Sequence, residues 1–175
     1  GIGVIKYERG FDKDLYLNCH QCNGSLFDDA NLAIHQKING LSVLDFYQIE
    51  IGELLPQLPK SLGNLVQILE TANELGLGHL QLSRKTQTLS GGEARRLKLC
   101  EHLARKKETK KILIIDEPVA GLDPETASKV AYFIRQKSDL FSAVILIEHR
   151  KEVINYVDYE VKIGPFSGKD GGEIL

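Results

Sequence analysis

Two adjacent glycines stand at the expected start of a helix in the segment TLSGGEARRLKL, residues 88–99. Glycine loses more backbone freedom on folding than other residues and has no side chain to pack, so the pair needs a physical reason. Ser90, Gly91 and Gly92 would present free backbone N–H groups at the positive end of the helix, with no Cβ to block an anion. The segment is a candidate phosphate site. The alternative is a plain capping box between Ser90 and Glu93.

Adjacent carboxylates end an apolar run in the segment KILIIDEP. Ligands of a wound α/β sheet bind at the carboxyl ends of its strands. Asp116 at such an end can hold Mg²⁺ directly or through water, and Glu117 beside it can orient and polarise an attacking water. The alternative is an acidic turn, which is common for one carboxylate and much less so for Asp-Glu-Pro after an apolar run.

A histidine follows a further apolar run in AVILIEH. A single histidine is usually a surface residue or a hydrogen-bonded core residue. His149 nevertheless follows its run as Asp116 does, so both side chains would lie at the same edge of one sheet.

The elements that must position these residues alternate in type from about Lys85 onward. The segments KILIID, AVILIEH and YEVKIG are predicted strands, with helices after Ser90, Pro124 and Arg150. Runs that are apolar on both faces indicate a buried parallel sheet, and the alternation indicates a wound α/β core.

One face of the helix from Ser90 is expected to pack on that core. The expected apolar face carries Leu97, Cys100, Leu103 and Ala104. The charged residues mostly lie elsewhere on the helix, namely Arg95, Arg96, Lys98 and Glu101. Cys100 is therefore expected to be a plain core residue.

The part of the chain before Arg84 is less regular. Short strands are predicted at residues 4–7, 15–17 and 32–38, around the segment CHQCNG and before the Asn39-Gly40 turn. Three- and four-residue spacing of apolar residues predicts helices in LSVLDF, IGELLPQL and LGNLVQILETANELG, separated by a corner at Pro56 and Pro59.

Composition limits the functions open to the chain. It has 175 residues, a net charge of −2 and a pI of about 6.2, so it is not a uniformly basic nucleic-acid-binding domain and any DNA contact would use a local patch. The sequence has neither an apolar run of about 18 residues nor a charged-then-apolar leader, which predicts a cytoplasmic protein with no membrane partner. Its three cysteines do not make a disulfide framework.

The order LSGGE, LIIDEP, AGLD and a strand ending in histidine resembles the C-terminal half of an ABC-type ATPase nucleotide-binding domain. Further segments resemble the UvrA family of the ABC excinuclease, the damage-sensing ATPase of bacterial nucleotide excision repair: GGEARRLKL, ELGLGHLQL, IEHRKEVINYVDYEVKIGP, GPFSGKDGGEIL and GVIKYERGFDKDLYLNCHQCNG. The resemblance covers nearly the whole chain and is closest to the second ABC half of that family.

The fold class implied is α/β: a partial ABC-type (P-loop NTPase) nucleotide-binding domain that lacks its phosphate-binding loop, with a zinc-module remnant and a helical signature region. No G-x-x-x-x-G-K-[ST] occurs, since GPFSGKD has the wrong spacing and Asp170 in place of the hydroxyl. The implied domains are residues 1–40, the C-terminal part of a zinc-binding module; residues 41–84, a helical segment of the signature subdomain; and residues 85–175, the ABC core portion.

The resemblance also implies roles and partners. Ser90, Gly91, Gly92 and Glu93 would form the signature loop, which completes the ATP site of the other ABC half. Asp116 would serve Mg²⁺, Glu117 would polarise water, His149 would contact the γ-phosphate, and Asp123 would link the two sites. The partners implied are damaged duplex DNA, the other ABC half, a second copy of the protein and the repair protein that acts next.

Cys19 and Cys22 form one Cys-x-x-Cys, which supplies half of a tetrahedral zinc site. The family's partner Cys-x-x-Cys lies just before the residues that match GIGVIK, so the resemblance implies a C-terminal fragment. Within this chain the missing ligands would have to come from His20, His35 or a second molecule. The alternative for the cysteines is a redox pair, but the thioredoxin-like strand-to-helix context is missing.

Some residues depart from the family pattern. VAGLDPET has Asp-Pro where that family usually has histidine, and Arg95 replaces a common glutamine. Three alternatives to a repair ATPase therefore stay open: a divergent paralogue such as a translation or resistance ATPase, the nucleotide-binding half of a transporter, and a non-catalytic interaction module.

Overall fold

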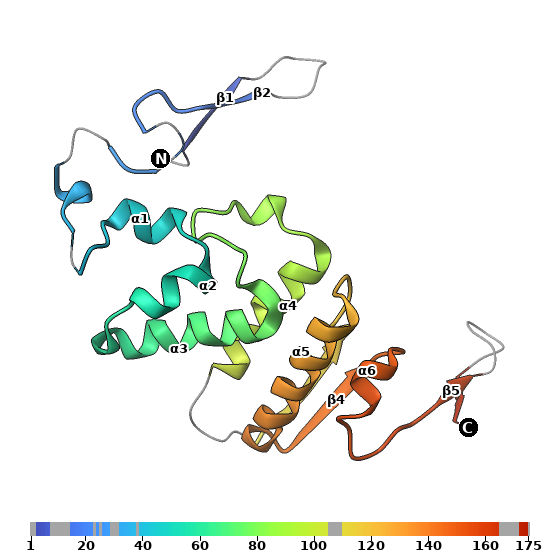
Figure 1. Ribbon diagram of the computed structural model, residues 1–175. Coiled ribbons are helices and arrows are strands. Elements are labelled where there is room, and N and C mark those ends of the chain that lie inside the picture. Colours follow the sequence, from blue (N-terminus) through green and yellow to red (C-terminus); the bar gives the residue numbers. More distant parts are fainter. Residues whose placement is uncertain are drawn as a thin grey trace. The chain divides into compact units, whose positions relative to one another are not determined.

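The chain forms two compact units in a computed structural model (Figure 1). The structure describes residues 3–7, 15–22, 24, 26–28, 32–37, 39–104, 110–164 and 172–174. Unit 1 comprises Gly1–Asn73 and Leu77–Leu89, and unit 2 comprises Glu74–Gly76 and Ser90–Leu175. The division of the chain at residues 40 and 84 stays a prediction.

Unit 1 opens with two paired strands, as the sequence predicts. Strands β1 (Val4–Tyr7) and β2 (Leu15–Asn18) are antiparallel, with Val4 opposite Asn18 and Tyr7 opposite Leu15. The predicted strand at residues 32–38 is wrong, because Leu32–His35 form a 3-10 helix. A strand needs a neighbour for its backbone hydrogen bonds, and in the described residues β1 and β2 pair with each other alone.

Three helices follow in unit 1, as the apolar spacing predicts: α1 (Val43–Gln48), α2 (Ile51–Leu54) and α3 (Gly63–Ala72). A capping box starts α1, since the Ser42 hydroxyl accepts from the Asp45 N–H at 3.1 Å and the Asp45 carboxylate accepts from the Ser42 N–H at 2.9 Å. Short 3-10 turns connect the helices at Leu55–Gln57 and Lys60–Leu62, where Pro56 and Pro59 stand. The corner predicted from the prolines is confirmed.

The core of unit 1 lies between these helices and the segment that follows α3. The N–H groups of Ile51 and Gly52 donate to the carbonyls of Leu80 and Gly78 at 2.9 Å each, which holds the start of α2 on that segment. A π-helix at Asn73–Leu77, whose residues 74–76 belong to unit 2, and a 3-10 helix at Thr86–Thr88 complete the elements between α3 and Leu89. The fully buried leucines here include Leu54 and Leu77.

Unit 2 is built on a parallel strand pair. Strands β3 (Ile112–Asp116) and β4 (Ala143–Ile147) pair in parallel, with Ile112 opposite Ala143 and Asp116 opposite Ile147. The connection runs through α5 (Pro124–Lys137) and a 3-10 turn at Ser138–Leu140, and α6 (Lys151–Ile154) follows β4. Figure 1 shows α5 beside β4. The predicted parallel pairing and strand–helix alternation are confirmed.

The two faces of this pair differ in exposure. Leu113, Ile115, Val144 and Leu146 share one face of the pair and are buried or partly buried. The opposite face carries four isoleucines that are between 48% and 63% exposed, namely Ile112, Ile114, Ile145 and Ile147. Burial on both faces was expected from the apolar runs, whereas the described residues cover only one.

The predicted strand YEVKIG does not join this pair. Only Ile163–Gly164 form a strand, β5, which is antiparallel to β6 (Glu173–Ile174). Tyr159, Val161 and Ile163 are 90%, 65% and 70% exposed. The segment alternates apolar and charged residues, which is typical of antiparallel strands with one solvated face and not of central parallel strands.

Helix α4 (Gly91–Leu103) begins where the sequence predicts and buries Cys100 and Leu103 as expected, but its buried face is rotated from the predicted one. Its buried residues are Arg96, Leu99, Cys100 and Leu103, at the three- and four-residue spacing of one helix face. Leu97 is 41% exposed and Arg96 only 4% exposed, the reverse of the expected order. The Arg96 guanidinium is accommodated because Nη1 donates to the Ala120 carbonyl at 3.0 Å. Cys100 is a core residue, 3% exposed, as expected.

Among the described residues, no helix has the length and apolar composition needed to cross a membrane.

Candidate functional site

Ser90 caps α4 in a complete capping box. Its hydroxyl accepts from the Glu93 N–H at 3.2 Å, and the Glu93 carboxylate accepts from the Ser90 N–H at 2.7 Å. The capping-box alternative is thus confirmed for these side chains. The box stabilises the first turn and leaves the helix N-terminus with its positive dipole end.

The two glycines of this turn have different surroundings. A Cβ on Gly91 would meet no atom within 4 Å, so this position is open to an approaching group. A Cβ on Gly92 would lie 2.7 Å from the Ala120 carbonyl oxygen, closer than real Cβ atoms come. The absence of a side chain at Gly92 therefore has a packing reason inside unit 2, namely the close approach of α4 to the segment after β3.

Asp116 and Glu117 follow each other at the carboxyl end of β3. Asp116 is the last residue of the strand and is exposed, and the Glu117 N–H donates to the Ile147 carbonyl of β4 at 3.0 Å. Glu117 has a φ of +45°, a left-handed conformation that is uncommon for a residue with a side chain. Such strain costs on the order of 1–3 kcal/mol and occurs preferentially at functional sites.

The Glu117 carboxylate contacts a residue that sequence reasoning did not place in the site. Arg95 Nη1 lies 2.9 Å from Glu117 Oε2, and both side chains are about half exposed, at 48% and 45%. Arg95 is one helical turn beyond the cap of α4, so this ion pair joins α4 to the end of β3. Its long sequence separation hides it from a motif search.

Asp123 caps α5. Its carboxylate accepts from the Thr126 N–H at 3.0 Å. Hydrogen bonds from Thr126 lower the pKa of the Asp123 carboxyl below its usual value. The larger effect comes from the Thr126 side chain and the smaller one from its backbone. The carboxylate therefore stabilises a helix start, whatever role it has across an interface.

His149 lies two residues after β4 with its side chain 82% exposed. The peptide around it is held by Glu148, whose side chain is only 4% exposed and whose Oε2 accepts from the N–H groups of His149 at 2.8 Å and Arg150 at 3.3 Å. Sequence reasoning missed Glu148. The signal for it was a carboxylate at the end of an apolar run, where a strand turns into a loop.

Arg150 connects the histidine segment to the segment before α5. Its Nη1 donates to the Leu122 carbonyl at 2.7 Å and to the Val119 carbonyl at 3.2 Å, and its Nη2 lies 3.0 Å from Glu152 Oε1. Three arginines thus donate hydrogen bonds to the segment 117–122. Arg95 binds the Glu117 carboxylate, and Arg96 and Arg150 bind backbone carbonyls of the segment. Unit 2 brings the four predicted motifs together through these bonds.

The cysteine pair lies in unit 1. Cys22 is 7% exposed and Cys19 is partly exposed. Hydrogen bonds from the backbone of Gln21, then of Cys22, lower the pKa of the Cys19 thiol, which favours the thiolate that binds metals. No group of three or more His, Cys, Asp or Glu side chains suited to a metal occurs among the described residues. The assignment of Cys19 and Cys22 to a zinc site stays a prediction.

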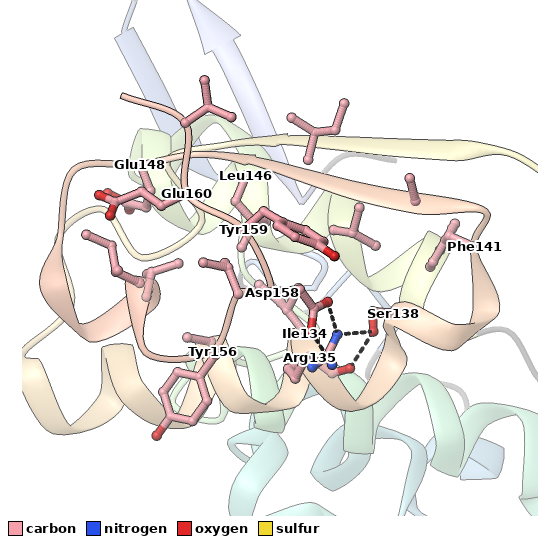
Figure 2. Close-up of a pocket in the computed structure, with 18 of the residues that line it drawn as sticks. Ile134, Arg135, Ser138, Phe141, Leu146, Glu148, Tyr156, Asp158, Tyr159 and Glu160 are labelled. Atoms are coloured by element: carbon pink, nitrogen blue, oxygen red, sulfur yellow. Dashed lines mark hydrogen bonds and ion pairs between the residues drawn. The ribbon is translucent and has the colours of Figure 1, made fainter. Parts of the chain in front are cut away.

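A pocket of about 960 Å³ lies elsewhere in unit 2, between α5, β4 and residues 153–164 (Figure 2). Glu148 and His149 belong to its lining, whereas Ser90, Asp116 and Glu117 do not. Figure 2 shows Arg135 facing Asp158, with Nη1 and Nη2 each 2.8 Å from a carboxylate oxygen. This bidentate pair fastens the segment after α6 to α5.

Comparison with known proteins gives the same family from sequence and from structure. A family model described as "ABC transporter" matches residues 21–120. The chain is 35% identical over all its 175 residues to the UvrABC system protein A of Rickettsia bellii (strain RML369-C), and it spans 18% of that protein. The corresponding protein of Streptococcus pneumoniae (serotype 4, strain TIGR4) is 34% identical, with 18% of its length covered.

A solved structure also resembles nearly the whole chain. The crystal structure of UvrA2 from Deinococcus radiodurans matches 98% of this chain and 21% of that chain, with a TM-score of 0.81 and 28% identity. The predicted α/β ABC fold is thereby confirmed. The chain belongs to the ABC ATPases and, within them, to the UvrA family, of whose curated members it spans about one fifth or less.

Proposed function

We propose that this chain is part of a DNA-damage-recognition ATPase of nucleotide excision repair, in which paired ABC halves hydrolyse ATP to drive a DNA clamp. The observation that carries the proposal is that hydrogen bonds in unit 2 hold the segments of Ser90, Glu117 and His149. The chain that contains them is similar to UvrA proteins over its full length.

The positions of the side chains support the roles proposed in cis. Asp116 is an exposed carboxylate at the carboxyl end of a parallel strand, a donor and a place that suit Mg²⁺. Bound Mg²⁺ supplies charge neutralisation at phosphate oxygens. Glu117 orients the attacking water and takes up its proton. His149, with an exposed imidazole on a peptide held by Glu148, would hydrogen bond to the γ-phosphate.

The roles in trans belong to the signature turn. Gly91 leaves open space at the positive end of α4, so Ser90, Gly91 and Gly92 suit the phosphates bound by the other ABC half. Asp123 would link the two sites across that interface. Because the sequence holds no G-x-x-x-x-G-K-[ST], this chain by itself is expected not to hydrolyse ATP.

We infer that residues 1–40 belong to a zinc module, residues 41–84 to the helical part of the signature subdomain and residues 85–175 to the ABC core. Cys19 and Cys22 supply two thiolates, and tetrahedral zinc takes four ligands. A second pair from elsewhere in the protein or from a second molecule would complete the site. The wider partners proposed are damaged duplex DNA, a second copy of the protein and the repair protein that acts next.

ATP turnover of the full-length gene product tests the ATPase role. Turnover is expected in the wild type and lost in Glu117→Gln, because the amide keeps the shape of the side chain and cannot take up a proton. Turnover at the wild-type rate in Glu117→Gln would refute the assignment of Glu117.

Binding to undamaged and UV-irradiated duplex DNA, with ATP and at two salt concentrations, tests the repair role. Phosphate contacts dominate such affinities and depend on salt, so only a preference that persists at both concentrations supports damage recognition. Equal binding to both duplexes would leave the ATPase role and move the protein to a divergent paralogue with another substrate.

A further inference from the structure

Arg95 and Glu117 form an ion pair at the place where hydrolysis is proposed to occur. The two residues are 22 positions apart, and Arg95 Nη1 lies 2.9 Å from Glu117 Oε2. This charge-assisted hydrogen bond takes up one acceptor site of the carboxylate and directs the group toward Arg95. As it stands, the carboxylate is held by the protein.

The backbone on both sides of this pair is fixed. Glu117 donates its N–H to the Ile147 carbonyl at 3.0 Å, and its carbonyl accepts from the Ala120 N–H at 3.2 Å. On the side of α4, Gly92 packs against the Ala120 carbonyl and Arg96 donates to the same oxygen at 3.0 Å. The distance between Arg95 and Glu117 is therefore set by the contact between α4 and residues 117–120.

The neighbouring arginine cannot replace Arg95 in this contact. Arg96 is 4% exposed and directed to the Ala120 carbonyl, whereas the Arg95 side chain is 48% exposed. An exposed ion pair is weak and is screened by salt, so it can open and close without disturbing the fold. The pair has the properties of a switch and contributes little to stability.

We propose that Arg95 is a positioning residue that holds the Glu117 carboxylate away from the attacking water in the resting state. The inference rests on the proposed role of Glu117. When the exposed Arg95 side chain turns away, the pair opens and Glu117 becomes available. In the step that follows, the water oxygen bonds to the γ-phosphorus, the bond to ADP breaks, and the water proton passes to Glu117.

The test is steady-state ATP hydrolysis by the full-length gene product carrying Arg95→Gln, measured at low and high ionic strength. Arg95→Gln is expected to raise kcat by about two- to five-fold at low salt, the range that an exposed ion pair supports, with KM for ATP unchanged. The ratio of variant to wild-type kcat should fall toward one at high salt because screening opens the pair in the wild type. Arg95→Lys keeps the positive charge, so its kcat should stay close to that of the wild type.

A matched control is available in the same unit. Arg135→Gln removes another arginine–carboxylate pair of similar exposure, 45% and 59%, outside the site (Figure 2). It is expected to leave kcat unchanged at both salt concentrations. The double variant Arg95→Gln, Glu117→Gln should be as inactive as Glu117→Gln, since the gain in rate requires the carboxylate.

The outcomes separate this inference from the proposed function. If Glu117→Gln is inactive and Arg95→Gln hydrolyses ATP at or below the wild-type rate, the positioning role of Arg95 is refuted and the ATPase role stands. If Glu117→Gln retains the wild-type rate, the role of Glu117 fails and that of Arg95 fails with it. An equal gain in Arg135→Gln would show a general effect of charge and would also overturn the proposal.

Discussion

The contact between Gly92 and the Ala120 carbonyl can be tested by adding one methyl group. In Gly92→Ala the new Cβ would lie 2.7 Å from that oxygen, whereas in Gly91→Ala it would meet nothing within 4 Å. Both positions are in the first turn of α4 and neither has a positive φ, so alanine suits the backbone at each. The two variants therefore differ in packing and share the change in helix propensity.

The magnitude follows from opposing effects. Alanine in place of glycine stabilises a compatible helical position by about 0.4–1 kcal/mol. At position 92, overpacking costs about 1–3 kcal/mol. A shift of the Ala120 carbonyl would also weaken its hydrogen bond from the buried Arg96 guanidinium, and an unsatisfied buried group costs about 1–3 kcal/mol. Because the propensity gain is common to both variants, we expect Gly92→Ala to be less stable than Gly91→Ala by roughly 2–6 kcal/mol.

Urea unfolding of this chain, followed by far-ultraviolet circular dichroism, measures the difference. Gly91→Ala should unfold at a urea concentration equal to or above that of the wild type, and Gly92→Ala clearly below it, with unchanged slopes. Equal midpoints for the two variants would refute the close approach of α4 to residue 120, and with it the arrangement that sets the Arg95–Glu117 distance.

Three further predictions concern α4 and α5. Leu103→Ala should lower the free energy of unfolding by about 2–5 kcal/mol because Leu103 is fully buried. Leu97→Ala, at a 41% exposed position, should lower it by less than about 1 kcal/mol. Urea unfolding of both variants checks which face of α4 is buried. Burial raises the pKa of the Cys100 thiol to about 11, so Cys100 should stay unlabelled by a thiol reagent near neutral pH and react only after unfolding, as peptide mass spectrometry would show; rapid native labelling would contradict its place in the core. Hydrogen bonds from Thr126 lower the folded-state pKa of Asp123. The charged carboxylate therefore stabilises the fold at pH values above the ordinary carboxyl pKa. This stabilisation disappears as the pH falls through the lowered folded-state pKa. Asp123→Asn keeps a capping side chain, and unfolding across a pH series should show its stability deficit at neutral pH shrinking as the pH falls below the ordinary carboxyl pKa; a deficit independent of pH would exclude the charge as its cause.

Local patterns predicted much of the candidate site. Ser90 and Glu93 have the spacing of a capping box, and the structure forms that box at the start of α4. The apolar runs before Asp116 and Glu148 predicted parallel strands that end at one edge, and the two strands pair in that way. These features depend on residues near each other in the chain or on the hydrophobicity of a single run, so the sequence contains the information directly.

Other features required partners that are distant in sequence. The prediction of a strand at residues 32–38 failed because no neighbouring strand satisfies its backbone groups among the described residues. The prediction for YEVKIG held only at its end, where β5 pairs with β6 and not with β4. The buried face of α4 was predicted one residue out of register, since the Ala120 carbonyl gives the Arg96 guanidinium a partner that no local rule contains.

The sequence by itself determined the parallel strands β3 and β4, the positions where α4 and α5 begin and the membership of the UvrA family, because these depend on local spacing and on residue order. Only the tertiary structure decided that packing requires a glycine at position 92 and that Arg95 binds the Glu117 carboxylate. It also decided that Arg96 donates to the Ala120 carbonyl and Arg150 to the Leu122 carbonyl. The physical reason is that hydrogen bonds and steric contacts between α4 and the segment after β3 join residues more than twenty positions apart, and their geometry exists only once the chain has folded.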